Sequence, residues 1–368
     1  MRLSSLSVLL LVLLAAAPAL AQITPPATPP AASDEPPPLD DLNLDQLGDA
    51  TVGGKSYCTQ KVLYATPTKL ITVGYEAQGR YGLTTKTGPA YPFQGGEVRA
   101  QVRDARGLRL GFNAPVISRN SIIVNLGLTY WNTGQTLFRT LQDVPPGIEY
   151  FSLLEDGLRT TGFNATVFKP LDTKHFLLFQ ANLDLSGTYR TFGDLDRRQL
   201  TASGTAIYGW KPTDNFQWGL GATRTYRAGQ LIYVPVVLYN RTFSPRWGCE
   251  VVFPARAELR RNFGTSALIK IGYELEGNAY YLGQLAGGQD VYLRRGELKP
   301  RITYEQKISG FVWLTAQVGL RYNYRNDAFR HQNPTGERDG LLGSESALFA
   351  NTLTNPVFAN LSLHLVSP

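Results

Sequence analysis

From Lys69 onward, apolar and polar positions alternate along the chain. Between Ile71 and Tyr81 every second residue is apolar, aromatic or glycine, whereas most residues between them are polar or charged. Successive side chains of a β-strand point to opposite sides, so this alternation predicts a strand with one apolar and one polar face. The pattern returns in 122–130, 177–189, 267–275 and 312–324, and a last strand is expected at 357–366.

These stretches are longer than the roughly 5–6 residues of an average globular strand. They match the ~9–11 residues that a tilted strand needs to cross a membrane. We therefore predict an all-β fold, a transmembrane antiparallel up-and-down β-barrel of about 12 strands, with a range of about 10–14. The range reflects 231–263, where Pro235, Pro245 and Pro254 interrupt the pattern. A large secreted β-sandwich or β-helix is the alternative.

The beginning of the chain predicts export. Arg2 precedes an apolar stretch over 6–17, and Ala19 and Ala21 occupy the positions that a signal peptidase reads. Residues 1–21 are therefore expected to be a cleaved signal peptide. Residues 22–56 are rich in proline and acidic, which is typical of an extended segment, and we expect it in the periplasm. Residues 57–368 form the expected barrel.

Composition narrows the class of protein. No later stretch resembles a membrane helix, and 19 Tyr, 17 Phe and 36 Gly suit barrel walls. The formal net charge of +7 could suggest nucleic acid, but export makes outer-membrane lipid the expected partner and nucleic acid an unexpected one. By the usual arrangement, short turns face the periplasm and long loops, here 132–156 and 326–355, face outward.

Aromatic residues near the strand ends fit the girdles that mark the membrane interfaces of such barrels. They are Trp131, Trp210, Trp218, Trp247, Tyr280 and Tyr281.

At this point the chain resembles uncharacterised bacterial outer-membrane β-barrel families known as domains of unknown function. The resemblance covers roughly 60–366 and rests on the signal peptide, proline-marked turns, the run Tyr208 to Pro212, and Trp247 to Phe253 followed by Pro254. It implies the fold and an outer-membrane location. It implies no activity and no functional residues.

The polar face of the strands carries both signs of charge. One interpretation is a narrow interior filled by ion pairs, because an unpaired charge in a confined space is costly. The other is a water-filled, anion-leaning pore. The cost of unpaired charge favours the filled interior. Parity places these residues toward the lumen: Glu76, Arg80, Arg99, Arg103, Asp184, Arg256, Glu258, Arg295, Glu297, Lys299, Arg301 and Arg321.

Candidate chemistry is sparse. His175, His331 and His364 are the only histidines, and none has a serine or acid at a recognisable motif spacing. We expect no enzyme, no cofactor and no metal site. Cys58 and Cys249 are the only thiols, and an oxidising compartment leaves open both a disulfide and two free thiols.

Two functions remain in front. The first is a narrow channel for small solutes, biased toward anions by arginines such as Arg99, Arg103, Arg301 and Arg321. The second is a non-transporting barrel that serves envelope integrity or partner docking. An outer-membrane lipid-modifying enzyme is a more distant third.

Overall fold

The computed structural model describes residues 57–367 apart from 92–96, 140–147, 286 and 334–344. The expected signal peptide (1–21) and the proline-rich segment (22–56) lie outside the described residues.

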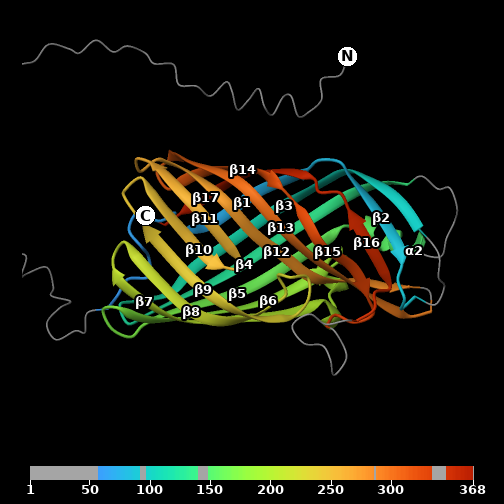
Figure 1. Cartoon of the computed structure of the whole chain (residues 1–368), viewed down its shortest axis with the longest axis horizontal. Coiled ribbons are helices and arrows are strands. Elements are labelled where there is room, and N and C mark those ends of the chain that lie inside the picture. Colours follow the sequence, from blue (N-terminus) through green and yellow to red (C-terminus); the bar gives the residue numbers. More distant parts are fainter. Residues whose placement is uncertain (1–56, 92–96, 140–147, 286, 334–344, 368) are drawn as a thin grey trace, which may run out of the picture. The chain divides into compact units, whose positions relative to one another are not determined.

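One antiparallel sheet contains all strands, and it closes on itself because β1 pairs with β17 on one side and β3 on the other. Sequential strands are neighbours around the wall (Figure 1). The elements are β1 (Lys69–Gln78), β2 (Tyr81–Thr87), β3 (Glu97–Arg119), β4 (Ile122–Arg139), α2 (Ile148–Glu155), β5 (Leu158–Pro170), β6 (His175–Gly187), η3 (Phe192–Asp194), η4 (Arg197–Gln199), β7 (Leu200–Thr213), β8 (Phe216–Thr225), β9 (Ile232–Thr242), β10 (Trp247–Phe253), β11 (Arg256–Phe263), β12 (Ala267–Leu285), β13 (Gln289–Ser309), β14 (Val312–Leu320), β15 (Tyr322–Phe329), β16 (Phe349–Leu353) and β17 (Val357–Val366).

The 17 segments make fourteen crossings of the wall, because β1 with β2, β14 with β15, and β16 with β17 are each two segments of one crossing. The prediction of about 12 strands was therefore too low. The difficulty lay in 231–263, which holds three strands. Two of them, β10 and β11, have 7 and 8 residues and fall below the ~9–11 residues by which membrane strands are recognised.

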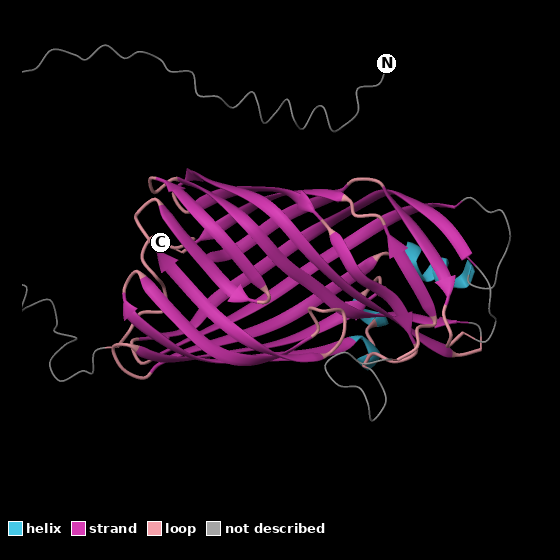
Figure 2. Ribbon diagram, viewed as in Figure 1, coloured by secondary structure: helices cyan, strands magenta, loops and turns pink. Residues whose placement is uncertain are grey.

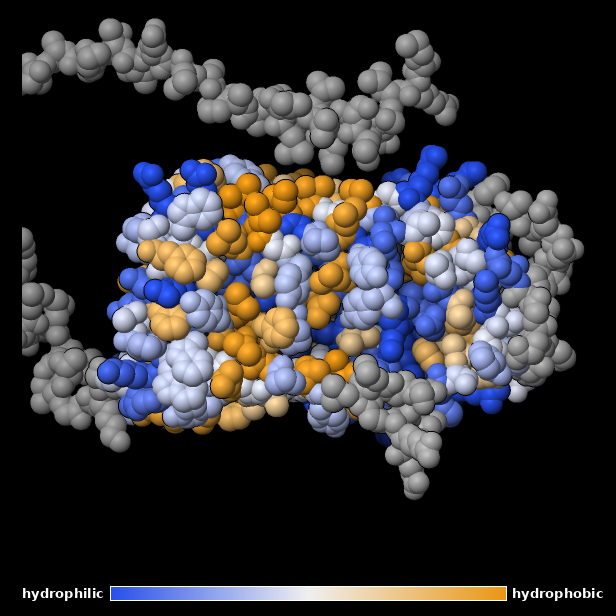
Figure 3. All heavy atoms as spheres, in the orientation of Figure 1, coloured by the Kyte–Doolittle hydropathy of each residue, from blue (hydrophilic) through white to orange (hydrophobic). Residues whose placement is uncertain are grey.

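The outer face of the wall is apolar along its central part. Ile71, Val73 and Tyr75 of β1 are 41, 51 and 50% exposed, whereas Glu76 is 5% exposed. Figure 3 shows hydrophobic residues gathered across the middle of one face and hydrophilic residues toward its two ends. An apolar surface of this extent suits lipid rather than water. The predicted transmembrane up-and-down β-barrel is thus confirmed.

The connections differ between the two ends of the barrel. Short hairpins join β5 to β6, β7 to β8 and β13 to β14 at the end where β17 finishes (Figure 1). Most connections at the opposite end are longer. The prediction that 132–156 is a loop was wrong for much of this range, since β4 continues to Arg139 and α2 follows (Figure 2). In the part of the chain that the structure describes, no helix is long and apolar enough to cross a membrane.

The expected aromatic girdle is only partly present. Trp210 and Trp218 stack at 4.5 Å, and Trp247 is 41% exposed. Tyr280 and Tyr281 are instead buried, at 1 and 7% exposure, because the wall at that end encloses a packed core.

Both cysteines are free, so the structure does not form the disulfide that the sequence left open. Cys58 is buried against Phe168 and Phe176 at the short-hairpin end, and Cys249 lies in β10 beside Arg241 and Leu259. Leu259 is 46% exposed, and a residue paired directly opposite projects to the same side of a sheet. Cys249 therefore points outward.

We expect reductant to leave the electrophoretic mobility of the full chain unchanged. Burial raises the pKa of the Cys58 thiol, so less reactive thiolate is present at a given pH and maleimide should label Cys58 slowly until the barrel is unfolded. Counting adducts by mass spectrometry before and after unfolding tests this. A shift in mobility upon reduction would contradict it.

Candidate functional site

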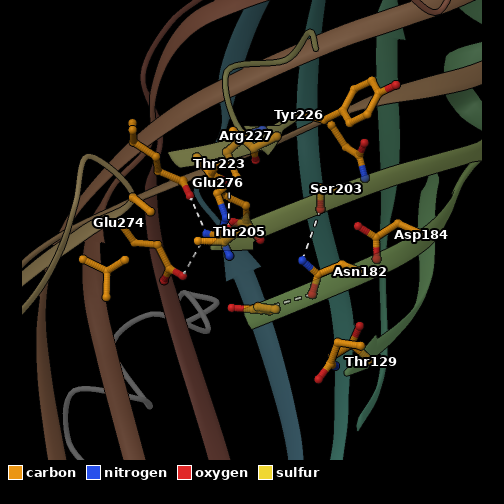
Figure 4. A pocket seen from close by; sticks show the side chains of 18 of the residues that line it. Thr129, Asn182, Asp184, Ser203, Thr205, Thr223, Tyr226, Arg227, Glu274 and Glu276 are labelled. Carbon is orange, nitrogen blue, oxygen red and sulfur yellow. Dashed lines mark hydrogen bonds and ion pairs between the residues drawn. The ribbon is translucent and has the colours of Figure 1, made fainter. Parts of the chain in front are cut away.

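The interior holds a chamber of about 670 Å³, lined by β1, β3 to β10, β12 and the β8–β9 connection. Figure 4 shows its lining, with Asn182, Asp184, Ser203 and Thr205 on neighbouring strands and Glu274 and Glu276 on another part of the wall. Two kinds of surface face each other across this chamber.

The first surface is an ionic network centred on Glu76. This carboxylate pairs with Arg109 at 3.0 Å and Lys299 at 3.4 Å, and also with Arg321. Arg109 and Lys299 meet again at Glu276, at 2.9 and 2.7 Å. Each cation therefore touches two carboxylates, which is the arrangement that offsets the cost of removing these charges from water.

A second set of ion pairs lies toward the short-hairpin end. Lys270 bridges Glu258 at 3.3 Å and Glu305 at 3.1 Å. Lys69 also reaches Glu305, at 3.2 Å. Arg301 pairs with Glu258 at 3.0 Å and with Glu274. The two sets together, called the ionic network below, involve β1, β3, β11, β12 and β13 and also Arg321, which lies between β14 and β15.

Most of the predicted lumenal residues lie where parity placed them. Asp184 lines the chamber, and Arg256 shares the inward face of β11 with Glu258. The other inward residues are members of the network, namely Glu76, Glu258, Arg295, Glu297, Lys299, Arg301 and Arg321.

The predicted lumenal position was wrong for Arg80, Arg99 and Arg103. All three are exposed, and the side chain of Arg99 is 80% exposed beside Glu97. The register of β3 against β4 shifts between Val102 and Asp104. Such a bulge adds one residue and exchanges the two faces of the strand. Because of this bulge, Arg99 and Arg103 point outward and Arg109 points inward, although strict alternation places all three on one face.

The second surface consists of neutral polar groups from three adjacent strands, β6, β7 and β8. Asn182 of β6 donates to Ser203 of β7 at 3.1 Å, and Gln180 donates to Asn182 at 3.1 Å. Thr205 and Thr223 share a hydrogen bond of 2.7 Å. These residues form a patch of hydroxyl and amide groups along the chamber.

One end of the barrel is filled by an apolar core around α2. Tyr150 stacks on Phe349 at 4.5 Å, and its hydroxyl accepts a hydrogen bond from Asn351 at 2.6 Å. Tyr150, Phe151 and Leu154 pack with residues of β2, β3, β12, β13, β15 and β16. Because these strands surround the helix, α2 lies inside the wall and fills part of the lumen at the long-loop end.

The other end is narrowed by residues 57–68, which run along the hairpins. The backbone N–H groups of Cys58 and Leu63 donate to the carbonyls of Asp172 and Asp214, both at 2.9 Å. Thr66 donates to Glu250 through its N–H and its hydroxyl, at 2.9 and 2.8 Å. Cys58 of this segment packs in an apolar cluster with residues of the strands, namely Phe168, Phe176, Ile207, Val236 and Leu238.

The ladder of the wall is interrupted beside the chamber. β9 pairs with β10 only from Val237 onward, and β12 pairs with β11 only as far as Glu274. The connection between β8 and β9 crosses this interruption, where Arg227 donates to the carbonyl of Leu275 at 3.0 Å. Pro254 and Leu275 both line the chamber, so the chamber borders the interrupted part of the wall.

The histidines lie in separate places. His175 pairs with Asp172 in a hairpin at 2.7 Å, His331 pairs with Glu345 at 3.0 Å, and His364 shares a 2.8 Å hydrogen bond with Thr72. Among the described residues, no group of three or more His, Cys, Asp and Glu side chains is placed to hold a metal ion.

Residues 151–334, half of the 368-residue chain, match the family model described as Domain of unknown function (DUF6268). The chain belongs to this family. The matched span runs from α2 through β15 and contains much of the ionic network and of the neutral patch. No curated protein matches the sequence.

Three solved structures show distant similarity. A Pseudomonas aeruginosa FadL homologue has a TM-score of 0.36 and 10% identity, covering 81% of this chain and 90% of its own. An outer membrane channel from Pseudomonas putida F1 has a TM-score of 0.34 and 11% identity, and the similarity covers 81% of this chain and 96% of the channel. The Pseudomonas putida toluene transporter TodX has a TM-score of 0.34 and 7% identity, and the similarity covers 84% of this chain and 95% of TodX. These similarities are too distant to assign a solute to the present family.

Replacing the central carboxylate should destabilise the barrel. Glu76→Gln leaves Arg109, Lys299 and Arg321 with one carboxylate fewer in a buried site, which typically costs about 3–5 kcal/mol. We expect a lower free energy of unfolding in urea and a lower temperature at which the folded band disappears on gels.

Glu97→Gln is the matched control, since Glu97 also joins two cations but lies on the exposed side of the wall. It should change stability little. Equal losses in the two variants would show that the network contributes nothing beyond an exposed pair.

Proposed function

We propose that the protein is an outer-membrane channel for small solutes, in which the chamber is the binding and transit site and α2 is the closure at the outer end. The chamber itself carries this proposal. A barrel built only for mechanical stability has no need to keep about 670 Å³ of space, lined by both polar and apolar side chains, between two packed ends.

Several features support the outer membrane as the location. The sheet is closed and has no free edge, which is the condition for a sheet to cross lipid. Its outer face is apolar, and residues 1–21 have the pattern expected of an export signal. We infer that the short hairpins and residues 57–68 face the periplasm and that α2 lies at the external end.

The ionic network favours a second candidate, a barrel that does not transport. Ion pairs from β1, β3, β11, β12 and β13 and from Arg321 hold one side of the lumen together. The same pairs remove support for an anion-leaning pore, because Arg301 and Arg321 are paired and Arg99 and Arg103 are exposed. Neither candidate requires the chain to be an enzyme.

Loosening the external closure should open the channel. In Tyr150→Ala with Phe151→Ala, two fully buried rings of α2 are removed, which leaves a void at the long-loop end. We expect higher single-channel conductance in planar bilayers and faster swelling of proteoliposomes in small neutral sugars than for the wild type.

Phe163→Ala is the control, because Phe163 is an aromatic residue of β5 that is 42% exposed on the outer face. It should leave conductance unchanged. If the α2 variant folds, as judged by heat-modifiable mobility, and still conducts no ions and passes no sugar, the non-transporting barrel is the correct reading.

A further inference from the structure

The charged groups that line the chamber are unequal in their contacts. They are Arg109, Asp184, Arg227, Glu274 and Glu276. Arg109 pairs with Glu276 at 2.9 Å, and Arg227 lies 3.7 Å from Glu274. No ion pair or side-chain hydrogen bond joins the carboxylate of Asp184 to a residue that the structure describes.

Asp184 projects from β6 beside the neutral patch (Figure 4). No dashed line reaches it, whereas its neighbour Asn182 is bonded to Ser203. The charge of Arg227 acts on Asp184 from a distance, but its guanidinium contacts Glu274 and the carbonyl of Leu275 instead. The carboxylate is therefore free to receive a donor from inside the chamber.

The wall is shaped to hold this carboxylate. Gly162 of β5 stands opposite Asp184 in the ladder. A Cβ at Gly162 would lie 2.3 Å from Asp184 Oδ1 and 2.6 Å from Thr129 Oγ1. Glycine thus leaves the space in which the carboxylate and the Thr129 hydroxyl lie side by side.

We propose that Asp184 makes the chamber selective for a small hydroxylated organic cation of the amino-sugar class. The ammonium group would pair with Asp184, because hydrogen bonds between ionised groups are the strongest available in such a site. The hydroxyl groups would bond to the amides and hydroxyls of the neutral patch, from Asn182 to Thr223. This inference rests on the proposed function and reverses the anion preference expected from the sequence.

The test compares three ligands of one shape and different charge: D-glucosamine, D-glucose and D-glucuronate. Equilibrium dialysis with the detergent-solubilised full chain gives their affinities. We expect glucosamine to bind at least about ten-fold more tightly than glucose, and glucuronate to bind most weakly. Asp184→Asn should abolish the difference between glucosamine and glucose.

Gly162→Ala provides a second variant that keeps the carboxylate but displaces it, and it should also reduce the preference for glucosamine. Asp214→Asn removes an exposed carboxylate from the neighbouring hairpin and should change nothing. Heat-modifiable mobility confirms folding in every variant.

Tightest binding of glucuronate, equal binding of all three ligands, no binding, or an unchanged preference in Asp184→Asn would each overturn the inference. Proteoliposome swelling in the α2 variant separates this failure from failure of the proposed function. Uptake of sugars without dependence on Asp184 removes only the cation selectivity, whereas absence of any uptake removes the channel itself.

Discussion

Closure of the backbone ladder is the constraint on which the rest of the molecule depends. A sheet in lipid has no water to satisfy a free edge, so the first and last crossings must meet, as β1 and β17 do. Closure fixes which residues point outward and which point inward. The apolar outer face, the inward charges and the chamber all follow from that single condition.

A closed wall of fourteen crossings encloses more space than its own backbone fills. The protein fills two parts of this space and leaves a third part open. Aromatic and aliphatic residues around α2 fill the external end, as in the core of a soluble domain. Ion pairs around Glu76 fill one side, where charges of both signs neutralise each other. The hydroxyl and amide groups of β5 to β8 leave the remaining space to solvent or a ligand.

The sequence predicted what lipid imposes directly. β1, β6, β12 and β17 were recognised because one face of each must be apolar. Features set by contacts distant in the sequence could not be recognised. Arg99 and Arg109 face opposite sides only because of the β3 bulge. The helix α2 is stable only within the surrounding strands, since isolated helices of 8 residues are marginal in water. The short strands β10 and β11 lack the length that marks a membrane strand.

The interrupted ladder between β9 and β12 gives the barrel a low side and a high side. β10 and β11 have 7 and 8 residues, whereas β12 and β13 have 19 and 21. The long strands β12 and β13 exceed the ~9–11 residues of a membrane strand, whereas β10 and β11 fall below them. The low side therefore offers lipid less wall than the high side does. The chamber borders that low side, since Pro254 and Leu275 line it, so the lateral boundary of the chamber there is the β8–β9 connection and not a continuous ladder of strands.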